Sequence, residues 1–262
     1  LLPGSVGRRP PKPNPMPRRA VLSDEQRMAL LALPDDETTL VQHWTLSEDD
    51  LAIIVRRRRP HNRLGFAIQL CALRYPGRLL RPGELIPDTP LAFVAEQLQI
   101  APEVLADYAT RGPTRYEQLD ALREGFGFTQ FSRPLRAALQ EWLLPIALTT
   151  TSGAGLARSL LGECRRRRII VPGISSVERM VAQALLDAER HVAAHLTRGL
   201  ETGQRRLLDA LLLPHAGTNL SGLGWVRQPP GKPGRKTFAG IIRRLALLRD
   251  IGIDPDIAAG IH

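Results

Sequence analysis

The chain has 262 residues, 43% of them hydrophobic, which is enough to build a core and excludes a disordered basic tail. Lysine and arginine number 36 against 26 acidic residues, and the net charge of +10 favours a polyanionic partner, most commonly nucleic acid. No apolar run approaches the roughly 20 residues that span a bilayer, no signal peptide is visible, and Cys71 and Cys164 lack metal-ligand spacing, so we expect a cytoplasmic protein with buried thiols.

The first predicted helices lie between residues 23 and 75. Ser23 and Gln26 form a capping box that predicts a helix start, and Ser47 and Asp50 form a second one. The second helix is predicted to carry four consecutive arginines, Arg56–Arg59, at its carboxyl end and to stop at Pro60. A third helix from about residue 62 to 75 has an apolar stripe at helical spacing, made by Leu64, Ile68, Cys71 and Tyr75.

Helical signals continue to residue 213. A helix over 132–148 is predicted to break at Pro145, and the helix from 152 ends in a second run of four arginines at 165–168. Ser175 and Glu178 are predicted to cap the longest helix, from about 176 to 196. The following stretch, 214–236, is rich in Pro and Gly without an apolar period, so it predicts an extended basic linker.

These signals predict an all-α fold with two helical-bundle modules that contain helix-turn-helix-like elements. Pro-rich residues 1–20 are expected to be a disordered leader or a remnant of expression. The modules are predicted over 21–112 and 113–213, followed by the linker at 214–236 and the start of a further helical domain at 237–262.

The two arginine runs share a layout: an amphipathic helix, four arginines, a proline-containing turn and a second amphipathic helix. This is the plan of a helix-turn-helix, whose second helix can lie in a major groove. Cations at a helix carboxyl end interact favourably with the macrodipole, but one or two arginines would satisfy that. Four in succession repel one another, so we interpret both runs as phosphate contacts.

Base reading requires other side chains. In the first module His61, Asn62 and Arg63 open the helix that follows the arginines, where Asn pairs with adenine and Arg with guanine; the alternative is that Asn62 is only an N-cap. The linker is either a solvated spacer or an arm that enters a minor groove. The candidate DNA-binding residues are Arg56, Arg57, Arg58, Arg59, His61, Asn62, Arg63, Arg74, Arg78, Arg165, Arg166, Arg167, Arg168, Ser175, Ser176, Arg179, Arg227, Lys232, Arg235 and Lys236.

The chain shows no catalytic or metal-binding motif. It has no phosphate-binding glycine loop, no metalloprotease motif and no spaced Ser/His/Asp set. Its carboxylates gather in predicted first turns of helices, where they serve caps and dipoles. We therefore expect neither a catalytic residue nor a metal or other cofactor in this chain.

Four strings in order, "HNRLGFAIQLCALRYPGR", "PLAFVAEQLQI", "RRRRIIVPG" and "LSGLGWVRQPPGKP", give the sequence a family resemblance. From about residue 16 onward it resembles the N-terminal region of the Tn-three-type replicative transposases of bacteria, the class II, cointegrate-forming type. The resemblance implies helical modules that recognise the terminal inverted repeats of the transposon. It also implies an RNase H-like catalytic part, with three acidic residues for divalent metal, that lies outside this sequence.

The resulting expectation is a non-catalytic, sequence-specific binder of double-stranded DNA. We expect it in the bacterial cytoplasm, associated with the nucleoid and not with a membrane, and self-association would involve the remainder of the parent protein. The alternatives are a helical RNA-binding module, which would need exposed aromatics for stacking, and a protein-interaction scaffold with a basic surface.

Overall fold

The computed structural model describes residues 21–108, 112–215 and 219–252, so the predicted leader and the last ten residues lie outside the described part. The described residues form twelve α-helices and one 3-10 helix without a β-strand, which confirms the all-α prediction. The elements are α1 (Asp24–Leu31), α2 (Glu37–Trp44), α3 (Glu48–Ile54), α4 (Pro60–Arg74), α5 (Asp88–Leu98), η1 (Pro102–Asp107), α6 (Gly112–Phe126), α7 (Arg133–Thr149), α8 (Gly153–Arg166), α9 (Ile174–Thr197), α10 (Thr202–Ala210), α11 (Gly222–Arg227) and α12 (Arg235–Ile251).

The chain divides into two compact units. Unit 1 takes the described residues of Leu1–Leu143 and Ser152–Ala182, and unit 2 takes those of Leu144–Thr151 and Gln183–His262. Helices α7 and α9 therefore contribute residues to both units. Both arginine runs lie in unit 1.

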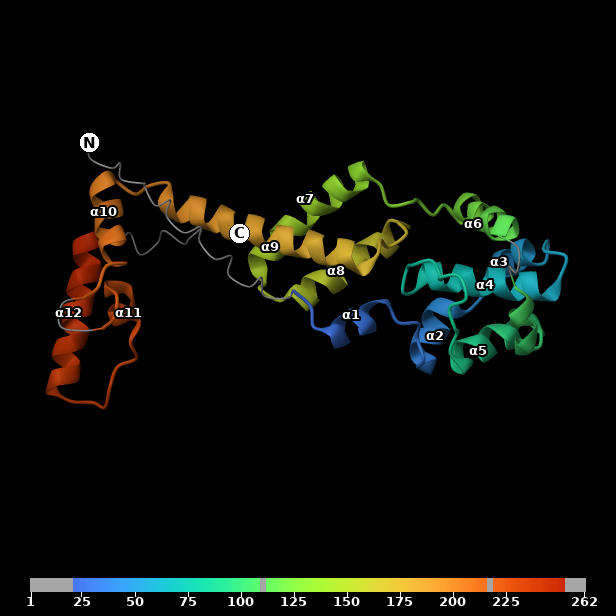
Figure 1. Ribbon diagram of the computed structural model, residues 1–262, viewed down its shortest axis with the longest axis horizontal. Coiled ribbons are helices and arrows are strands. Elements are labelled where there is room, and N and C mark those ends of the chain that lie inside the picture. The colour runs from blue at the N-terminus through green and yellow to red at the C-terminus, as the bar shows by residue number, and fades with distance from the viewer. Residues whose placement is uncertain (1–20, 109–111, 216–218, 253–262) are drawn as a thin grey trace, which may run out of the picture. The chain divides into compact units, whose positions relative to one another are not determined.

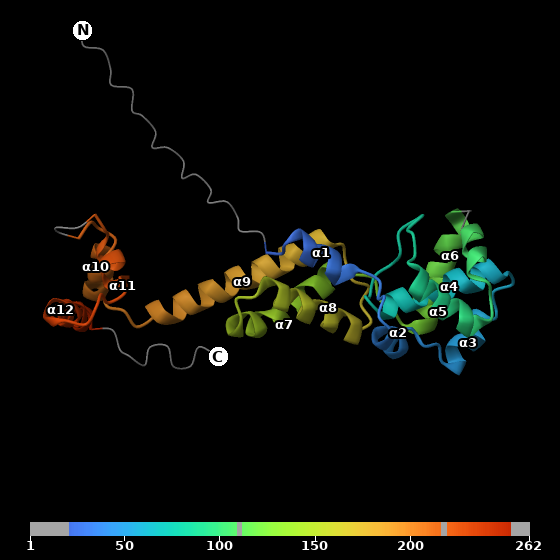
Figure 2. The ribbon, with the colours of Figure 1, turned by 90° about the horizontal axis from the view of Figure 1, so that it is seen from below.

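Helix α4 is the centre of unit 1. It contacts α2, α3, α5, α6 and η1, and Figures 1 and 2 show it among these elements. Every residue from Leu64 to Leu73 is buried. The sequence predicted a single apolar stripe on this helix, but Phe66, Leu70 and Leu73 face a second set of neighbours and are also buried. A helix enclosed in this way is a core element rather than an amphipathic surface helix.

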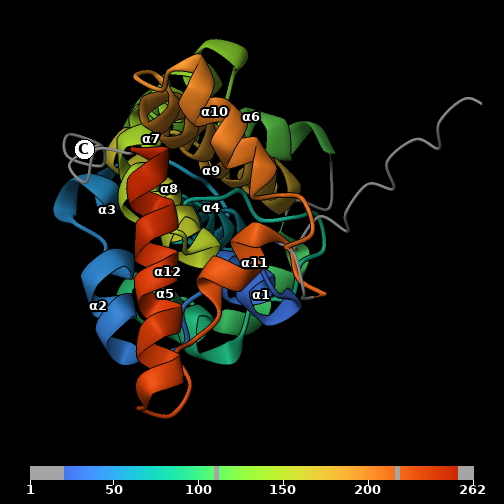
Figure 3. The same cartoon turned by 90° about the vertical axis from the view of Figure 1, so that its left-hand side faces the viewer.

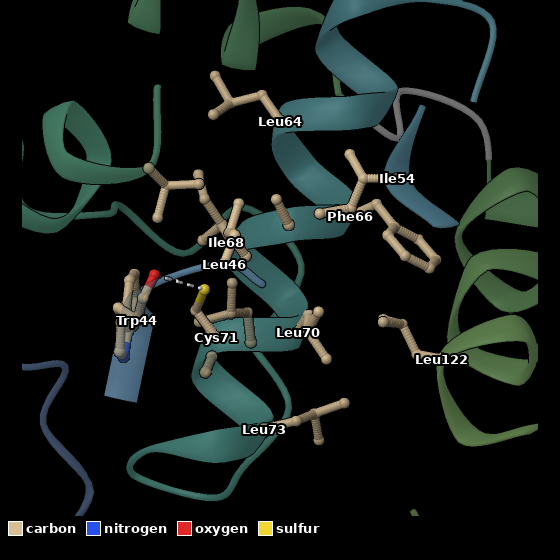
Figure 4. Close-up of a cluster of buried hydrophobic side chains, with 14 of the residues drawn as sticks. Trp44, Leu46, Ile54, Leu64, Phe66, Ile68, Leu70, Cys71, Leu73 and Leu122 are labelled. Carbon is tan, nitrogen blue, oxygen red and sulfur yellow. Dashed lines mark hydrogen bonds between the residues drawn. The ribbon is translucent and has the colours of Figure 1, made fainter. Parts of the chain in front are cut away.

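The core around α4 is drawn in Figure 4 and contains Trp44, Leu46, Ile54 and Leu122 from neighbouring segments. The indole Nε1 of Trp44 donates to the carbonyl oxygen of Tyr75 at 2.9 Å, and the Cys71 thiol lies 3.6 Å from the Trp44 carbonyl oxygen. Burial raises the pKa of the Cys71 thiol to about 12. Both cysteines are buried and free, as the sequence predicted.

Two predicted caps are confirmed and one predicted helix end is wrong. Ser23 and Gln26 cap α1, and Ser47 and Asp50 cap α3. Helix α3 ends at Ile54, however, so Arg56–Arg59 lie in the connecting turn and not on the helix. Pro60 begins α4 at its first position, where a missing N–H costs nothing because that group has no intrahelical partner.

Two further boundaries differ from the prediction. Helix α7 continues through Pro145 to Thr149, so the proline does not end it. Helix α9 begins at Ile174, and the amides of Ser176 and Val177 donate to the Gly173 carbonyl oxygen. Ser175 therefore lies within the first turn, two residues after Gly173, and is not the N-cap.

A main-chain hydrogen bond connects the predicted first and second modules across the position proposed for their boundary, because the amide of Val171 donates to the carbonyl oxygen of Gly77 at 2.8 Å. Within the predicted second module, the amide of Ile170 donates to the carbonyl oxygen of Thr129 at 2.9 Å. In the short apolar segment after the second arginine run, Ile169 forms an isolated bridge with Thr129, and the segment is not a strand.

Unit 2 contains α10, α11 and α12. Figure 3 shows α11 beside α12, and the Arg244 guanidinium of α12 lies 5.4 Å from the ring centroid of Trp225 in α11. Its Nη1 also donates to the Gln228 carbonyl oxygen. The stretch predicted as an extended linker therefore contains a helix, capped by Ser221, whose side chain accepts from the Gly224 amide.

Candidate nucleic-acid interface

Two arginines hold the turn between α3 and α4: Arg63 from α4 and Arg57 from the turn itself. Arg63, on the first turn of α4, donates from Nε to the carbonyl oxygen of Arg57 at 2.7 Å and from Nη2 to that of Val55 at 3.3 Å. The guanidinium of Arg57 packs over the ring of Phe66, 4.3 Å from its centroid. The turn is thus fixed to the core helix through both its main chain and one side chain.

The other three arginines of this turn, Arg56, Arg58 and Arg59, are exposed. Within the described residues none of them has a hydrogen bond or an ion pair from its side chain. Three adjacent like charges on an ordered turn repel one another, and a bound anion relieves that repulsion. We call these three residues the arginine turn.

The first turn of α4 stands directly after the arginine turn. His61 and Asn62 are half-buried there. Arg59 occupies the N-cap position without a side-chain cap, so Asn62 is not the N-cap. Because α4 is buried from Leu64 onward, it cannot lie lengthwise in a groove as a helix-turn-helix recognition helix does, and only its first turn is accessible.

Two other candidates from this segment are occupied internally. Nη2 of Arg74 pairs with the buried Asp50 carboxylate at 2.6 Å. Arg78 donates to both oxygens of Glu84, at 2.9 and 2.6 Å, and to the carbonyl oxygen of Leu31 at 2.7 Å. These contacts give both guanidinium groups structural roles.

The second arginine run, on α8 and the turn after it, is engaged differently. Arg166 forms a bidentate pair with Glu163, at 2.7 and 2.6 Å, and Arg167 adds a third hydrogen bond to the same carboxylate at 2.6 Å. Arg165 is half-buried, lies 5.0 Å from the ring centroid of Tyr75 and donates to the Pro76 carbonyl oxygen. Arg168 has a left-handed backbone, φ 53°, and donates to the Phe126 carbonyl oxygen at 3.0 Å.

Glu163 is the partner of the second arginine run that the sequence did not identify. Its side chain is 5% exposed and joins two arginines of the run. Hydrogen bonds from Arg166, and then from Arg167, hold its pKa at about 2 against the opposing effect of burial. The spacing of three and four residues between Glu163 and the two arginines is the helical ion-pair signal that would have identified it.

We predict that Glu163→Gln lowers the free energy of unfolding by about 2 kcal/mol at pH 7. The folded-state pKa lies below the ordinary value of 4.5, so the carboxylate stabilises the fold above that pH, and the stabilisation is lost as the pH falls from about 4.5 to about 2. Urea titrations at pH 7 and pH 3 test this, because the difference between wild type and variant should shrink at pH 3. Glu141→Gln, at an exposed glutamate, should change little at either pH.

The first turn of α9 carries the remaining candidates of unit 1. Ser175 and Arg179 are exposed and Ser176 is half-buried. Arg179 donates from Nε to the Ser175 carbonyl oxygen and from Nη2 to the Ser176 hydroxyl, both at 3.1 Å. Unlike α4, which is buried from Leu64 to Leu73, α9 has the exposed residues Ser175 and Arg179 near its amino end, which follows the second arginine run in the chain.

The basic candidates of unit 2 are exposed. Arg227 ends α11, Lys232 precedes α12, and Arg235 and Lys236 occupy the first turn of α12. Cations at a helix amino terminus oppose the macrodipole, so this placement does not stabilise α12. A bound anion would offset the repulsion between these cations and the positive end of the helix dipole. Near this end of α12, the Thr237 hydroxyl donates to the carbonyl oxygen of Lys232 at 2.7 Å.

Residues 21–108, 112–215 and 219–252 hold no helix long and apolar enough to cross a membrane. The same ranges contain no group of three or more His, Cys, Asp or Glu side chains placed to hold a metal ion.

The fold and the arginine turn define a class of protein: a basic, all-α chain with exposed arginines in the turn between two helices. The chain belongs to the family described as "Domain of unknown function (DUF4158)", which matches residues 21–184. It is also homologous to Tn-three-type bacterial transposases, which confirms the resemblance seen in the sequence.

Three relatives illustrate this homology. The chain is 38% identical to the transposase for transposon Tn21 of Escherichia coli and 36% identical to the transposase for transposon Tn501 of Pseudomonas aeruginosa, over 247 residues in each case. It is 28% identical to the transposase for transposon gamma-delta of Escherichia coli strain K12 over 240 residues. The first two alignments cover 94% of this chain and 25% of the relative, so the chain spans about a quarter of the length of these relatives.

Proposed function

We propose that this chain binds double-stranded DNA at transposon ends as the end-recognition part of a replicative transposase. The observation that carries the proposal is the arginine turn: Arg56, Arg58 and Arg59 are exposed and unpaired within the described residues. The turn that presents them is fixed by Arg63 and by the packing of Arg57 on Phe66. Because the main chain of the turn is fixed before binding, phosphate contact by these arginines costs side-chain but little main-chain conformational entropy.

The two helix-turn-helix-like elements, α3–α4 and α8–α9, have different tasks in this proposal. The α3–α4 element holds the DNA backbone through the arginine turn and reaches base edges only with His61 and Asn62. The α8–α9 element supplies the exposed first turn of α9, with Ser175 and Arg179, for the major groove. Residues of both elements lie in unit 1, and the Val171 amide donates to the Gly77 carbonyl oxygen between them, so in this proposal the two elements are DNA-contacting parts of one compact unit.

The basic residues of unit 2 extend the proposed contact. Arg227, Lys232, Arg235 and Lys236 are exposed, and a second binding region on the same chain raises the effective affinity for a long site. Catalysis and divalent-metal binding are assigned in this proposal to the part of the parent transposase that lies outside this chain.

The proposal is tested by gel-shift titration with three probes: the terminal inverted repeat of the cognate transposon, a scrambled duplex of equal length, and a matched RNA duplex. We expect the repeat to bind about a thousandfold more tightly than the scrambled duplex at physiological salt. The same affinity for all three probes would contradict end recognition and favour a non-specific basic module. Tighter binding to the RNA would favour the alternative of a helical RNA-binding module.

A further inference from the structure

Three arginines line a small hollow in unit 1, which has a volume of about 210 Å³. Arg74 ends α4, Arg165 lies in the last turn of α8, and Arg168 lies in the turn that follows α8. Within the described part of the chain no carboxylate lines the hollow, and its other lining residues are apolar: Leu73, Phe126 and Phe128. We call this site the arginine hollow, and none of its residues belongs to the arginine turn.

Arg165 is a half-buried cation without an acidic partner. Its Nη1 donates to the Pro76 carbonyl oxygen at 3.3 Å, and its guanidinium lies 5.0 Å from the Tyr75 ring centroid. Its Nε and Nη2 have no hydrogen-bond partner among the described residues, yet neither is among the side-chain atoms closed off from solvent. Burial lowers the pKa of this guanidinium, because desolvation disfavours the charged form and no carboxylate offsets it. An anion is therefore the partner that Arg165 lacks, and open donors remain for it.

Arg168 occupies a left-handed backbone conformation, with φ 53°, which favours glycine over a residue with a side chain. The main chain holds it there, because its amide donates to the Arg165 carbonyl oxygen at 3.0 Å and its carbonyl oxygen accepts from the Thr129 amide at 2.8 Å. Its Nη1 donates to the Phe126 carbonyl oxygen, while Nε and Nη2 have no partner in the part of the chain that the structure describes. The fold thus keeps a guanidinium beside the hollow at a strained position that glycine would fill without strain.

The acidic side chains next to these arginines are already paired. Asp50 is held by Arg74 at 2.6 Å, and Glu163 is held by the two arginines that follow Arg165 in the chain. Neither carboxylate lines the hollow, so the charges of Arg165 and Arg168 are not compensated there. The apolar walls exclude part of the water that would screen these charges, which strengthens their attraction for an anion.

We infer that the arginine hollow binds one phosphate group, with its oxygens accepting hydrogen bonds from Arg165 and Arg168. The two oxygens of a carboxylate lie in one plane and pair side by side with one guanidinium, whereas phosphate oxygens diverge and can accept from two. Arg74 remains paired with Asp50 and completes the wall. Because the hollow lies between the ends of α4 and α8, the bound phosphate links the α3–α4 and α8–α9 elements.

The source of this phosphate rests on the proposed function: it is a backbone phosphate of the bound duplex and not a free phosphate ion. Arg168 is exposed at the rim, where a duplex can approach it. The contact is independent of base sequence, because phosphate contacts fix the position of a protein on DNA and do not read bases.

Titration of the full chain with inorganic phosphate tests the site without DNA. The Nε–Hε signals of Arg165 and Arg168 in ¹H–¹⁵N NMR spectra should shift saturably. Acetate at the same ionic strength should shift them less. Unshifted signals, or an equal response to acetate, would overturn the inference.

Addition of a scrambled duplex to the phosphate-loaded chain distinguishes the two sources. The duplex should displace inorganic phosphate, and the ³¹P line of the phosphate ion should then narrow to that of the free ion. If inorganic phosphate stayed bound beside bound duplex, the assignment to the DNA backbone would be wrong. Failure of end recognition would appear instead as equal affinity for the repeat and the scrambled duplex, and it would leave the phosphate shifts in place.

Two variants and a control complete the test. Arg168→Gly removes one guanidinium and relieves the left-handed backbone, so it should melt close to wild type while phosphate binding weakens about tenfold. Arg165→Met keeps a long apolar side chain on Tyr75 and should weaken phosphate similarly. Arg158→Ala removes the same charge from an exposed position of α8 outside the hollow, and it should bind phosphate as wild type does. Wild-type phosphate affinity in Arg168→Gly and Arg165→Met would refute the site.

Discussion

Replacing the arginine turn, in the triple variant Arg56→Ala, Arg58→Ala, Arg59→Ala, should make DNA binding less dependent on salt. Each phosphate contact contributes about 0.9 to the slope of log affinity against log salt, so three contacts contribute about 2.7. Between 50 and 200 mM salt the wild type should lose about fortyfold more affinity than the variant. Fluorescence anisotropy with a labelled duplex over that salt range measures both slopes.

The design separates phosphate contact from other effects of the substitution. Arg57 is left in place because its guanidinium packs on Phe66 and its loss would disturb the turn. The triple lysine variant at 56, 58 and 59 should keep most of the slope, since this interaction depends on charge rather than on guanidinium geometry.

A second triple, Arg133→Ala, Arg136→Ala, Arg158→Ala, removes the same charge from exposed arginines elsewhere in unit 1. It should change the slope by less than the first triple. If the two alanine triples changed the slope equally, only the net charge would matter and the arginine turn would have no special role.

Local sequence signals predicted much of the fold. The capping boxes at Ser23 and Ser47 formed as expected because a cap depends only on residues within one turn. The burial of Cys71 and of its apolar stripe also followed from helical spacing. Pro145 misled the prediction because α7 accommodates it, and the sequence alone does not show what the surrounding structure will tolerate.

The candidate site was less predictable because side-chain partners come from distant parts of the chain. Arg78 and Arg63 both looked like free cations, yet one holds Glu84 and the Leu31 carbonyl oxygen while the other holds the turn after α3. Composition predicted a basic surface, but only the contacts show which arginines remain available on it.

Asp50→Ala should cause the largest loss of stability of any single substitution considered, about 3 kcal/mol in the free energy of unfolding. Asp50 is 2% exposed and its carboxylate has two tasks. It accepts from Nη2 of Arg74 at 2.6 Å, which joins α3 to the end of α4, and from the Ser47 amide at 2.8 Å in the capping box. Removing it leaves a partly buried guanidinium without its partner and the Ser47 amide without its acceptor in the capping box, while the Ser47 hydroxyl still caps the helix. Urea denaturation at pH 7 measures the loss.

The control for this prediction uses the same substitution at an ion pair in solvent. Asp24 pairs with Arg27 at 3.1 Å but is 91% exposed, so Asp24→Ala should cost no more than about 0.5 kcal/mol. The double variant Asp50→Ala, Arg74→Met should be more stable than Asp50→Ala alone, because it removes the unpaired charge. If adding Arg74→Met made the protein still less stable, the cost would come from lost packing around α3 and not from the buried charge.

The same residue should also make stability depend on pH. Burial by itself raises the pKa of Asp50, but the hydrogen bonds from Arg74 and Ser47 outweigh it, and the pKa lies below the ordinary value of 3.8. The ionised carboxylate therefore stabilises the fold above that pH, and the contribution is lost as the pH falls through the lowered pKa. Wild type should approach Asp50→Ala in stability under acid conditions. Where Asp50→Ala is still folded, its salt slope for DNA should equal that of wild type, because Asp50 positions helices α3 and α4 and leaves the charges of the arginine turn unchanged.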